Sequence, residues 1–190
     1  MKPGSDLVAV SIGPTLPISG HDVSFVSLAI RITTVAALLW LAAFDIRTRR
    51  LPTRVVLAIG LMFFVDAAVI RMPFVLVLTH VGLALAVFLT CAVLFFAKML
   101  GGGDAKLAAA IFLWVGLPLA LPALTLISVI GTVIALVSYA TQKMRPEQER
   151  PWMRLLVMFS GSRGVPYGVA LALGGGLLIV ASAMPFVLTR

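Results

Sequence analysis

The chain has 190 residues, of which 61% are hydrophobic and 12% are charged, and its formal net charge is +8 at pH 7. Soluble domains are closer to half apolar, and here the excess forms long uncharged runs, so the composition predicts an all-α polytopic membrane protein. The basic residues sit in short loops between these runs and are not interleaved with aromatic side chains, which excludes nucleic acid as a partner and indicates contact with a lipid bilayer.

We predict about six transmembrane helices, because about 20 apolar residues are needed to cross the hydrocarbon core. Residues 1–24, rich in Pro and Gly, are expected to be irregular, and residues 25–190 to form one six-helix domain. Arg31 lies near the start of the first run, close enough to its end for the side chain to reach the interface. A break at Gly116 and Pro118 separates the fourth and fifth runs. The predicted spans are Phe25–Phe44, Val55–Ile70, Phe74–Ala97, Ala105–Val115, Ala123–Ala140 and Val165–Leu188.

The distribution of Lys and Arg predicts the orientation. The loops after the first, third and fifth spans carry eleven of these residues, and the opposite side carries three. By the positive-inside rule the rich loops are cytoplasmic, and both termini lie on the non-cytoplasmic side. The longest of them is a polar loop at about 141–164, whose middle segment, Trp152–Phe159, is compatible with a surface helix.

Two aspartates are predicted to share one depth in the membrane. Asp45 ends the first span, and Asp104 begins the fourth, directly after the three glycines 101–103, which free the backbone for a sharp turn. Asp66 lies well inside the second span and should be far toward the opposite face. Asp45 and Asp104 are therefore the candidate pair.

Two interpretations of this pair stay open at the level of composition and spacing. In the first, Asp104 only caps the fourth helix, a role that Asp favours, and Asp45 only balances the neighbouring arginines. In the second, the two carboxylates share one proton, activate water and polarise a peptide carbonyl, as in aspartic proteases. That chemistry needs no cofactor and no metal, and the single cysteine and two distant histidines offer no metal cluster.

Three motifs resemble those of type IV prepilin peptidases, which are GxGD-type aspartic proteases. Residues 45–52 resemble the first aspartate motif: an Asp, a basic loop, an aliphatic residue and Pro, then usually Asn, where this chain has Thr53. Residues 101–106 match the second, Gly-any-Gly-Asp-any-Lys. Residues 166–168 resemble the Pro-Tyr-Gly element of the last helix, and together the motifs cover roughly residues 30–185 in the expected order.

The resemblance implies a bacterial inner-membrane endopeptidase that removes the short basic leader of prepilin-like substrate proteins on the cytoplasmic side. Asp45 and Asp104 match the catalytic aspartates. Longer family members have an N-terminal domain with cysteine pairs that is associated with N-methylation. This chain lacks it and resembles the short branch that serves Flp-type (tight adherence) pili, so no N-methyltransferase activity is expected. The residues expected to support the site or bind substrate are Gly101, Gly103, Lys106 and Pro52.

Helix position predicts different roles for the two aspartates. Asp104 begins a helix, where the macrodipole favours the charged form, and Asp45 ends one, where it does not. Asp104 is therefore expected to be the base and Asp45 the proton carrier.

A non-enzymatic alternative is a small transporter or a pilus-assembly scaffold, with Asp66 and Arg31 as its functional charges. We prefer for Asp66 a helix–helix hydrogen bond to a nearby Arg or Ser. Residues 174–176, three glycines, are expected to form a close helix contact.

Overall fold

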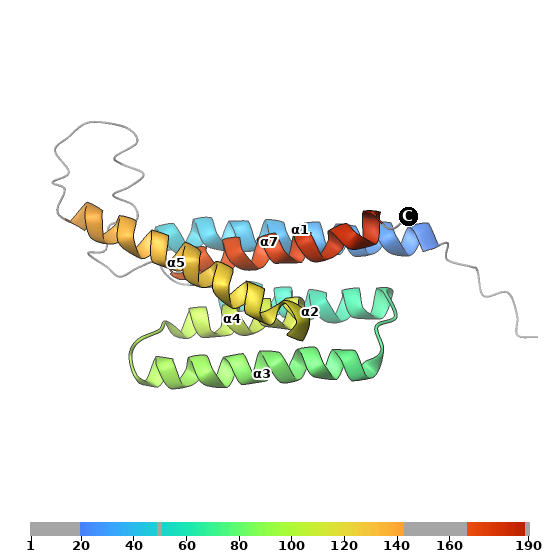
Figure 1. Cartoon of the computed structure of the whole chain (residues 1–190), viewed down its shortest axis with the longest axis horizontal. Coiled ribbons are helices and arrows are strands. Elements are labelled where there is room, and N and C mark those ends of the chain that lie inside the picture. The colour runs from blue at the N-terminus through green and yellow to red at the C-terminus, as the bar shows by residue number, and fades with distance from the viewer. Residues whose placement is uncertain (1–19, 49–50, 143–166, 189–190) are drawn as a thin grey trace, which may run out of the picture.

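The structure is a computed structural model that describes residues 20–48, 51–142 and 167–188, with side chains for 25–48, 51–139 and 167–182. Within these ranges every regular element is helical, which confirms the all-α class. The elements are α1 (Gly20–Thr48), α2 (Thr53–Val69), α3 (Phe74–Phe96), α4 (Gly102–Val115), the 3₁₀ turn η1 (Leu117–Leu119), α5 (Ala120–Gln142) and α7 (Tyr167–Leu188) (Figure 1).

Three of the described helical stretches are long and apolar enough to cross a membrane: Phe25–Thr48, Phe74–Phe96 and Leu117–Tyr139. By length and composition these three are candidate membrane spans, which agrees with a multi-pass protein. The 14-residue α4 is about 21 Å long, which is shorter than the hydrocarbon core of about 30 Å. The number of six spans and their orientation stay predictions.

Helix α1 is longer than the predicted span Phe25–Phe44, since it runs from Gly20 to Thr48. The reason is that no proline or glycine interrupts the sequence between Gly20 and Pro52. The expectation of an irregular segment as far as residue 24 is therefore wrong for residues 20–24. Asp45 consequently lies within the last turn of α1.

The turn between α3 and α4 is formed by Lys98, not by the three glycines. Lys98 has a φ of 59°, and its N–H and the next one along the chain bond back to carbonyls of the last turn of α3, a common way to end a helix. Gly101 is the extended N-cap residue, with φ −73° and ψ 141°, and Gly102 and Gly103 are already helical. The prediction that these glycines form the sharp turn is thus wrong.

The predicted break between the fourth and fifth runs is confirmed at Gly116, which has a φ of 69° and is followed by η1. Helix α5 then begins at Ala120 instead of Ala123, because Pro122 falls in its first turn, where an absent N–H costs nothing. Helix α5 continues through Gln142, and the rest of the predicted polar loop, with the segment Trp152–Phe159, lies outside the described residues.

Helix α4 is the centre of the bundle. Nine of its residues are buried, and it packs against α2, α3 and α7. Helix α3 packs mainly on α4 and has no buried residue, so most of its apolar surface faces outward. Figure 1 shows α1 beside α7, α4 beneath them and α3 outermost.

The bundle has two distinct ends. The left end in Figure 1 gathers the end of α1, the start of α2, the α3–α4 turn and the start of α7, while the start of α1 and the end of α7 lie at the right. Asp45 and Asp104 both belong to the left end.

Candidate active site

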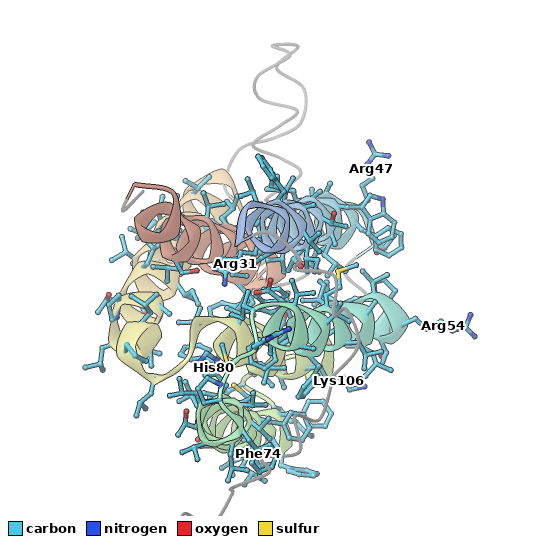
Figure 2. The ribbon with its side chains drawn as sticks, turned by 90° about the vertical axis from the view of Figure 1, so that its right-hand side faces the viewer. Arg31, Arg47, Arg54, Phe74, His80 and Lys106 are labelled. Atoms are coloured by element: carbon cyan, nitrogen blue, oxygen red, sulfur yellow. The ribbon has the colours of Figure 1, made fainter. Side chains whose placement is uncertain are left out.

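Asp45 is the one acidic residue of the α1–α2 junction, and its side chain is only 6% exposed. In contrast, Arg47 and Arg54 are exposed and point away from the bundle (Figure 2). A buried carboxylate is costly unless its surroundings compensate for lost hydration. The end of α1 thus directs the Asp45 carboxylate inward, while the guanidinium groups of Arg47 and Arg54 stay outside.

Asp104 occupies the third position of α4, three residues after the N-cap Gly101. Its carboxylate accepts a hydrogen bond from the backbone N–H of Gly101, which is the reach-back half of a capping box. The N-cap residue itself has no side chain to offer. The capping interpretation of Asp104 is therefore partly right, but this bond occupies only part of the carboxylate.

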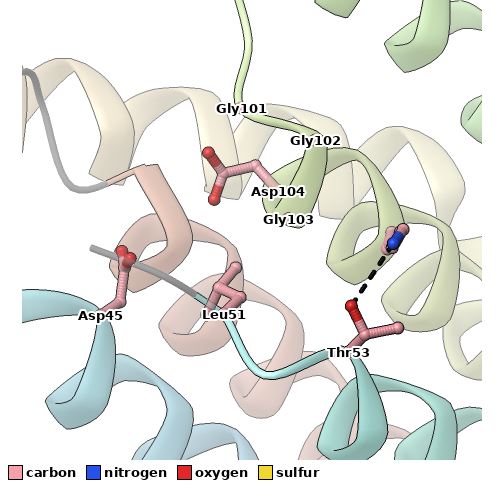
Figure 3. Close-up of a pocket in the computed structure, with 8 residues that line it drawn as sticks. Asp45, Leu51, Thr53, Gly101, Gly102, Gly103 and Asp104 are labelled. Atoms are coloured by element: carbon pink, nitrogen blue, oxygen red, sulfur yellow. Dashed lines mark hydrogen bonds between the residues drawn. The ribbon is translucent and has the colours of Figure 1, made fainter. Parts of the chain in front are cut away.

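Asp45 and Asp104 line the same cavity, which has a volume of about 310 Å³. Figure 3 shows the two carboxylates facing a shared space, with the first turn of α7 between them in this view. The structure therefore brings the two predicted aspartates together from different helices. The full lining is Asp45, Leu51, Thr53, Gly101, Gly102, Gly103, Asp104 and Lys106.

Helix α7 closes the site through Gly168, which is buried. A Cβ atom placed on Gly168 would lie 2.6 Å from Asp45 Oδ2 and 3.3 Å from Asp104 Oδ1. One backbone position of α7 is thus in close reach of both carboxylates.

The pKa of Asp104, which lies outside the three candidate spans, is raised from 3.8 to about 6. Burial is the larger cause, the negative charge of Asp45 is the second, and the hydrogen bond from Gly101 only partly opposes them. This direction is opposite to the one that a helix N-terminus alone favours, because a helix end is a small effect beside desolvation and a like charge. Which of the two aspartates is the base and which is the proton carrier stays a prediction.

Lys106 does not form an ion pair with Asp104 in the structure. Its ammonium donates to Thr53 Oγ1 over 3.4 Å, and this contact joins the first turn of α4 to the start of α2 (Figure 3). Pro52 is the N-cap of α2, and its carbonyl accepts the N–H of Val55 at 3.0 Å. The start of α2 thus lies beside the cavity, and the supporting role of Pro52 stays a prediction.

The glycines before Asp104 provide space. A Cβ on Gly101 would lie 2.8 Å from Asp104 Oδ2, and one on Gly103 would lie 3.0 Å from Cβ of Leu51. Side chains there would push away the carboxylate or the α1–α2 junction. The predicted substrate contacts of Gly101 and Gly103 stay predictions.

The other charged pair lies apart from this cavity. Asp66 accepts a hydrogen bond from Ser27 and forms an ion pair with Arg31, which confirms the preferred account of Asp66. Arg31 therefore points inward, and the prediction that it reaches the interface is wrong, because a buried carboxylate offers a closer partner. The transporter hypothesis assigned these two charges to transport. In the structure they form an ion pair with each other, which does not favour that role.

Four residues of the site were not predicted as site residues: Leu51, Thr53 and Gly102, which line the cavity, and Gly168, which lies against both carboxylates. All four stand inside or directly beside the three motifs, but spacing does not reveal what they touch. Among the described residues, no group of three His, Cys, Asp or Glu side chains could hold a metal ion. The chemistry available in the described cavity is that of its two carboxylates and a lysine.

An all-helical bundle with several apolar spans and two facing carboxylates at one end has the arrangement of a membrane-embedded aspartic protease. The model of the type IV leader peptidase family matches residues 32–136, more than half of the chain, including both aspartates. The chain belongs to this family, whose members are aspartic prepilin peptidases of the membrane, and this sets aside the non-enzymatic alternative. Comparisons with curated proteins and with solved structures found no match.

Proposed function

We propose that this protein cuts the leader peptide from prepilin-like substrates with Asp45 and Asp104 as its catalytic dyad and a water molecule as the nucleophile. The observation that carries the proposal is the cavity that two carboxylates from different helices share. The raised pKa of Asp104, caused in part by the charge of Asp45, supports a pair that holds one proton between two carboxyl groups.

In the proposed reaction the roles of the two aspartates are the reverse of those expected from helix position, and the raised pKa of Asp104 supports this assignment. Asp45, ionised, takes a proton from water as the oxygen attacks the scissile carbonyl carbon, and Asp104 donates its proton to the carbonyl oxygen. The tetrahedral intermediate then collapses: the carbon–nitrogen bond breaks, Asp45 returns its proton to the leaving amine, and Asp104 recovers the proton of the hydroxyl. The products are a carboxylic acid, which ionises in water, and a free amine, and the dyad is back in its starting state.

The position of the cavity supports a substrate with a basic leader and an apolar continuation. The cavity lies at the end of the bundle, where the α1–α2 junction and the α3–α4 turn meet, so a peptide there can enter from water while its apolar part stays in the lipid. The two carboxylates attract a basic leader. Lys106, on the rim, is suited to an acidic group or a carbonyl of the substrate.

We further propose that the cavity faces the cytoplasm in a bacterial inner membrane, with residues 25–190 as the peptidase domain. The support is the excess of Lys and Arg in the loops after the first, third and fifth predicted spans, eleven against three on the other side. A cysteine introduced at Thr53, on the cavity rim, should react with a membrane-impermeant maleimide in inverted vesicles and not in intact cells. Labelling in intact cells contradicts this orientation.

The substrate is proposed to be an Flp-type prepilin, with cleavage and no N-methylation. This finer assignment is supported by the resemblance to the short, peptidase-only branch. Incubation of the purified protein with an Flp-type precursor, followed by mass spectrometry, tests both parts. The expected product has a free, unmethylated N-terminus. If the protein leaves the Flp-type precursor uncut but cleaves another prepilin, the assignment of an Flp-type substrate is contradicted.

The dyad itself is tested by Asp45→Asn and Asp104→Asn, assayed for leader cleavage in detergent. Each variant should lose essentially all cleavage, at least about 1,000-fold, while insertion and expression are retained. Asp66→Asn is the matched control, because it changes a buried carboxylate outside the cavity and should retain cleavage per folded molecule. Cleavage by either Asn variant at the site would contradict the dyad.

A further inference from the structure

The inner face of α7 carries four buried glycines, and they differ in what an added methyl group would meet. At Gly174 and Gly175 it would collide with isoleucines of α5 and α4, at 2.7 and 2.6 Å. At Gly176 the nearest atom, from Val35, is 3.8 Å away, which is ordinary contact. Gly174 and Gly175 thus form the expected close helix contact.

Gly168 is different, because the atoms that approach it belong to the candidate catalytic groups. A Cβ there would lie 2.6 Å from Asp45 Oδ2, 3.0 Å from Asp45 Cγ and 3.3 Å from Asp104 Oδ1. Asp45 comes from α1 and Asp104 from α4, so three helices converge at this point.

Backbone geometry does not require glycine at this position. Gly168 is the second residue of α7, and Gly116 is the one described glycine with a positive φ. In a helical conformation alanine is favoured over glycine by about 1 kcal/mol. The structural reason for glycine at 168 is therefore the space that the two carboxylates occupy.

We propose that Gly168 is a positioning residue for the reaction: its bare backbone lets Asp45 and Asp104 approach each other, and so sets the separation of the two carboxylates. The inference rests on the proposed Asp45/Asp104 dyad and goes beyond it, since Gly168 lies outside the range that the family model matches. A methyl group at 168 displaces at least one carboxylate, and a displacement of about 1 Å is enough to cost about 100-fold in rate.

The kinetic test compares three identical substitutions on α7. Gly168→Ala should lower kcat by about 100-fold with KM changed less than about threefold, because the defect lies in the reacting groups. Gly175→Ala adds a methyl against Ile111, so it reports on packing alone, and Gly176→Ala adds one where there is room. Both should retain kcat per folded molecule. The proposal is overturned if Gly168→Ala keeps wild-type kcat, or if its loss equals that of Gly175→Ala.

A stability measurement tests the contact independently of activity. Gly168→Ala should lower the Tm in detergent, and most of this loss should disappear in an Asp45→Ala background, where the clashing carboxylate is absent. Even if Gly168→Ala alone fails to fold, the double variant should fold. An equal loss of Tm in both backgrounds overturns the proposal.

The same assays separate this inference from the dyad. If Asp45→Asn and Asp104→Asn are inactive and Gly168→Ala is as active as Gly176→Ala, the dyad stands and the positioning role fails. If either Asn variant cleaves at the normal rate, the dyad fails, and the inference about Gly168 fails with it.

Discussion

Arg31 of α1 and Asp66 of α2 form an ion pair inside the bundle, with 3.1 Å between Nη2 and Oδ2. Ser27 donates to the other oxygen of Asp66 over 2.5 Å, and Arg31 donates to Ser182 of α7 over 3.1 Å. The pair lies about 20 Å along α1 from Asp45, because Arg31 precedes Asp45 by nearly four turns. It joins the three helices α1, α2 and α7 away from the candidate site.

This pair should contribute to stability and not to catalysis. Asp66→Ala leaves the Arg31 charge without its partner, and we expect it to lower the free energy of unfolding by about 3 kcal/mol. The double variant Arg31→Met/Asp66→Leu removes both charges, so its free energy of unfolding should fall less than that of Asp66→Ala. Unfolding in mixed detergent measures the difference, with cleavage per folded molecule as the second readout. A double variant less stable than Asp66→Ala contradicts this account.

The pH dependence of cleavage should have its alkaline limb near pH 6. The active state holds one proton, and Asp104 loses it as the pH rises through its pKa of about 6. The measurement is kcat/KM from pH 4 to 8, with a tenfold fall per unit expected above the pKa. Asp45→Asn removes the second cause of the shift, so a carboxyl NMR titration should give Asp104 a lower pKa that still exceeds 3.8, since burial, the larger cause, persists. An unchanged pKa in Asp45→Asn contradicts the coupling.

The same shift has a consequence for stability, with a definite sign. A carboxyl whose pKa is higher in the folded state binds its proton more tightly there, so stability falls as pH rises from 3.8 to about 6. Asp104→Asn lacks this dependence. The Tm difference between Asp104→Asn and wild type should therefore grow over this interval in favour of the variant and stay constant above it.

The helical class and the candidate aspartates can both be predicted from the sequence, because both depend only on the length and the end points of the apolar runs. A run that ends at Asp45 and another that begins after Asp104 give the same depth without knowledge of packing. The space around a glycine cannot be predicted in this way, because it depends on side chains that other helices bring close to it. Gly103 faces Leu51, and Gly168 faces both carboxylates, and no local pattern encodes either approach.

The direction of the Arg31 side chain could not be predicted from the sequence, although the helix–helix hydrogen bond of Asp66 could. Arg31 has a long side chain that can reach either the interface or the bundle interior. Its direction depends on where α2 places Asp66, with which Arg31 forms an ion pair. The pKa of Asp104 is a similar case. Its helix position is readable from the sequence, but burial and the charge of Asp45, which dominate, arise only after packing.

The charge of Lys106 should contribute more to substrate binding than the hydrogen bond between Lys106 and Thr53 does. The bond between them is exposed and 3.4 Å long, so Thr53→Val should cost less than about 1 kcal/mol of stability and change kcat/KM less than about twofold. Thr53→Asn keeps an acceptor and should match wild type. Lys106→Met also removes a cation from the cavity rim and should raise KM severalfold. Steady-state cleavage assays of the three variants decide this, and equal effects of Thr53→Val and Lys106→Met would show that the contact itself matters.

The end of α4 depends on a glycine and a histidine that fit together. His80 of α3 donates from Nδ1–H to the carbonyl of Leu113 over 2.7 Å, and its ring stacks on Phe63 with 5.2 Å between centroids. Gly116 has a φ of 69°, and a Cβ there would collide with the His80 ring, 2.6 Å from Nε2. The positive φ and the missing side chain are both needed at this position.

Gly116→Ala should therefore be strongly destabilising, by about 1–2 kcal/mol for the left-handed backbone alone and by more for the collision. In a His80→Ala background the collision disappears and the backbone cost persists, so the added substitution should cost less there than in wild type. Gly82→Ala is the matched control: it lies on the same helix as His80 with nothing within 4 Å of its Cβ, and it should be neutral or stabilising because alanine is the better helix former. Tm in detergent measures all of these variants. A Gly116→Ala protein as stable as Gly82→Ala would show that α4 can end without this glycine, and the central helix would then owe its position to packing alone.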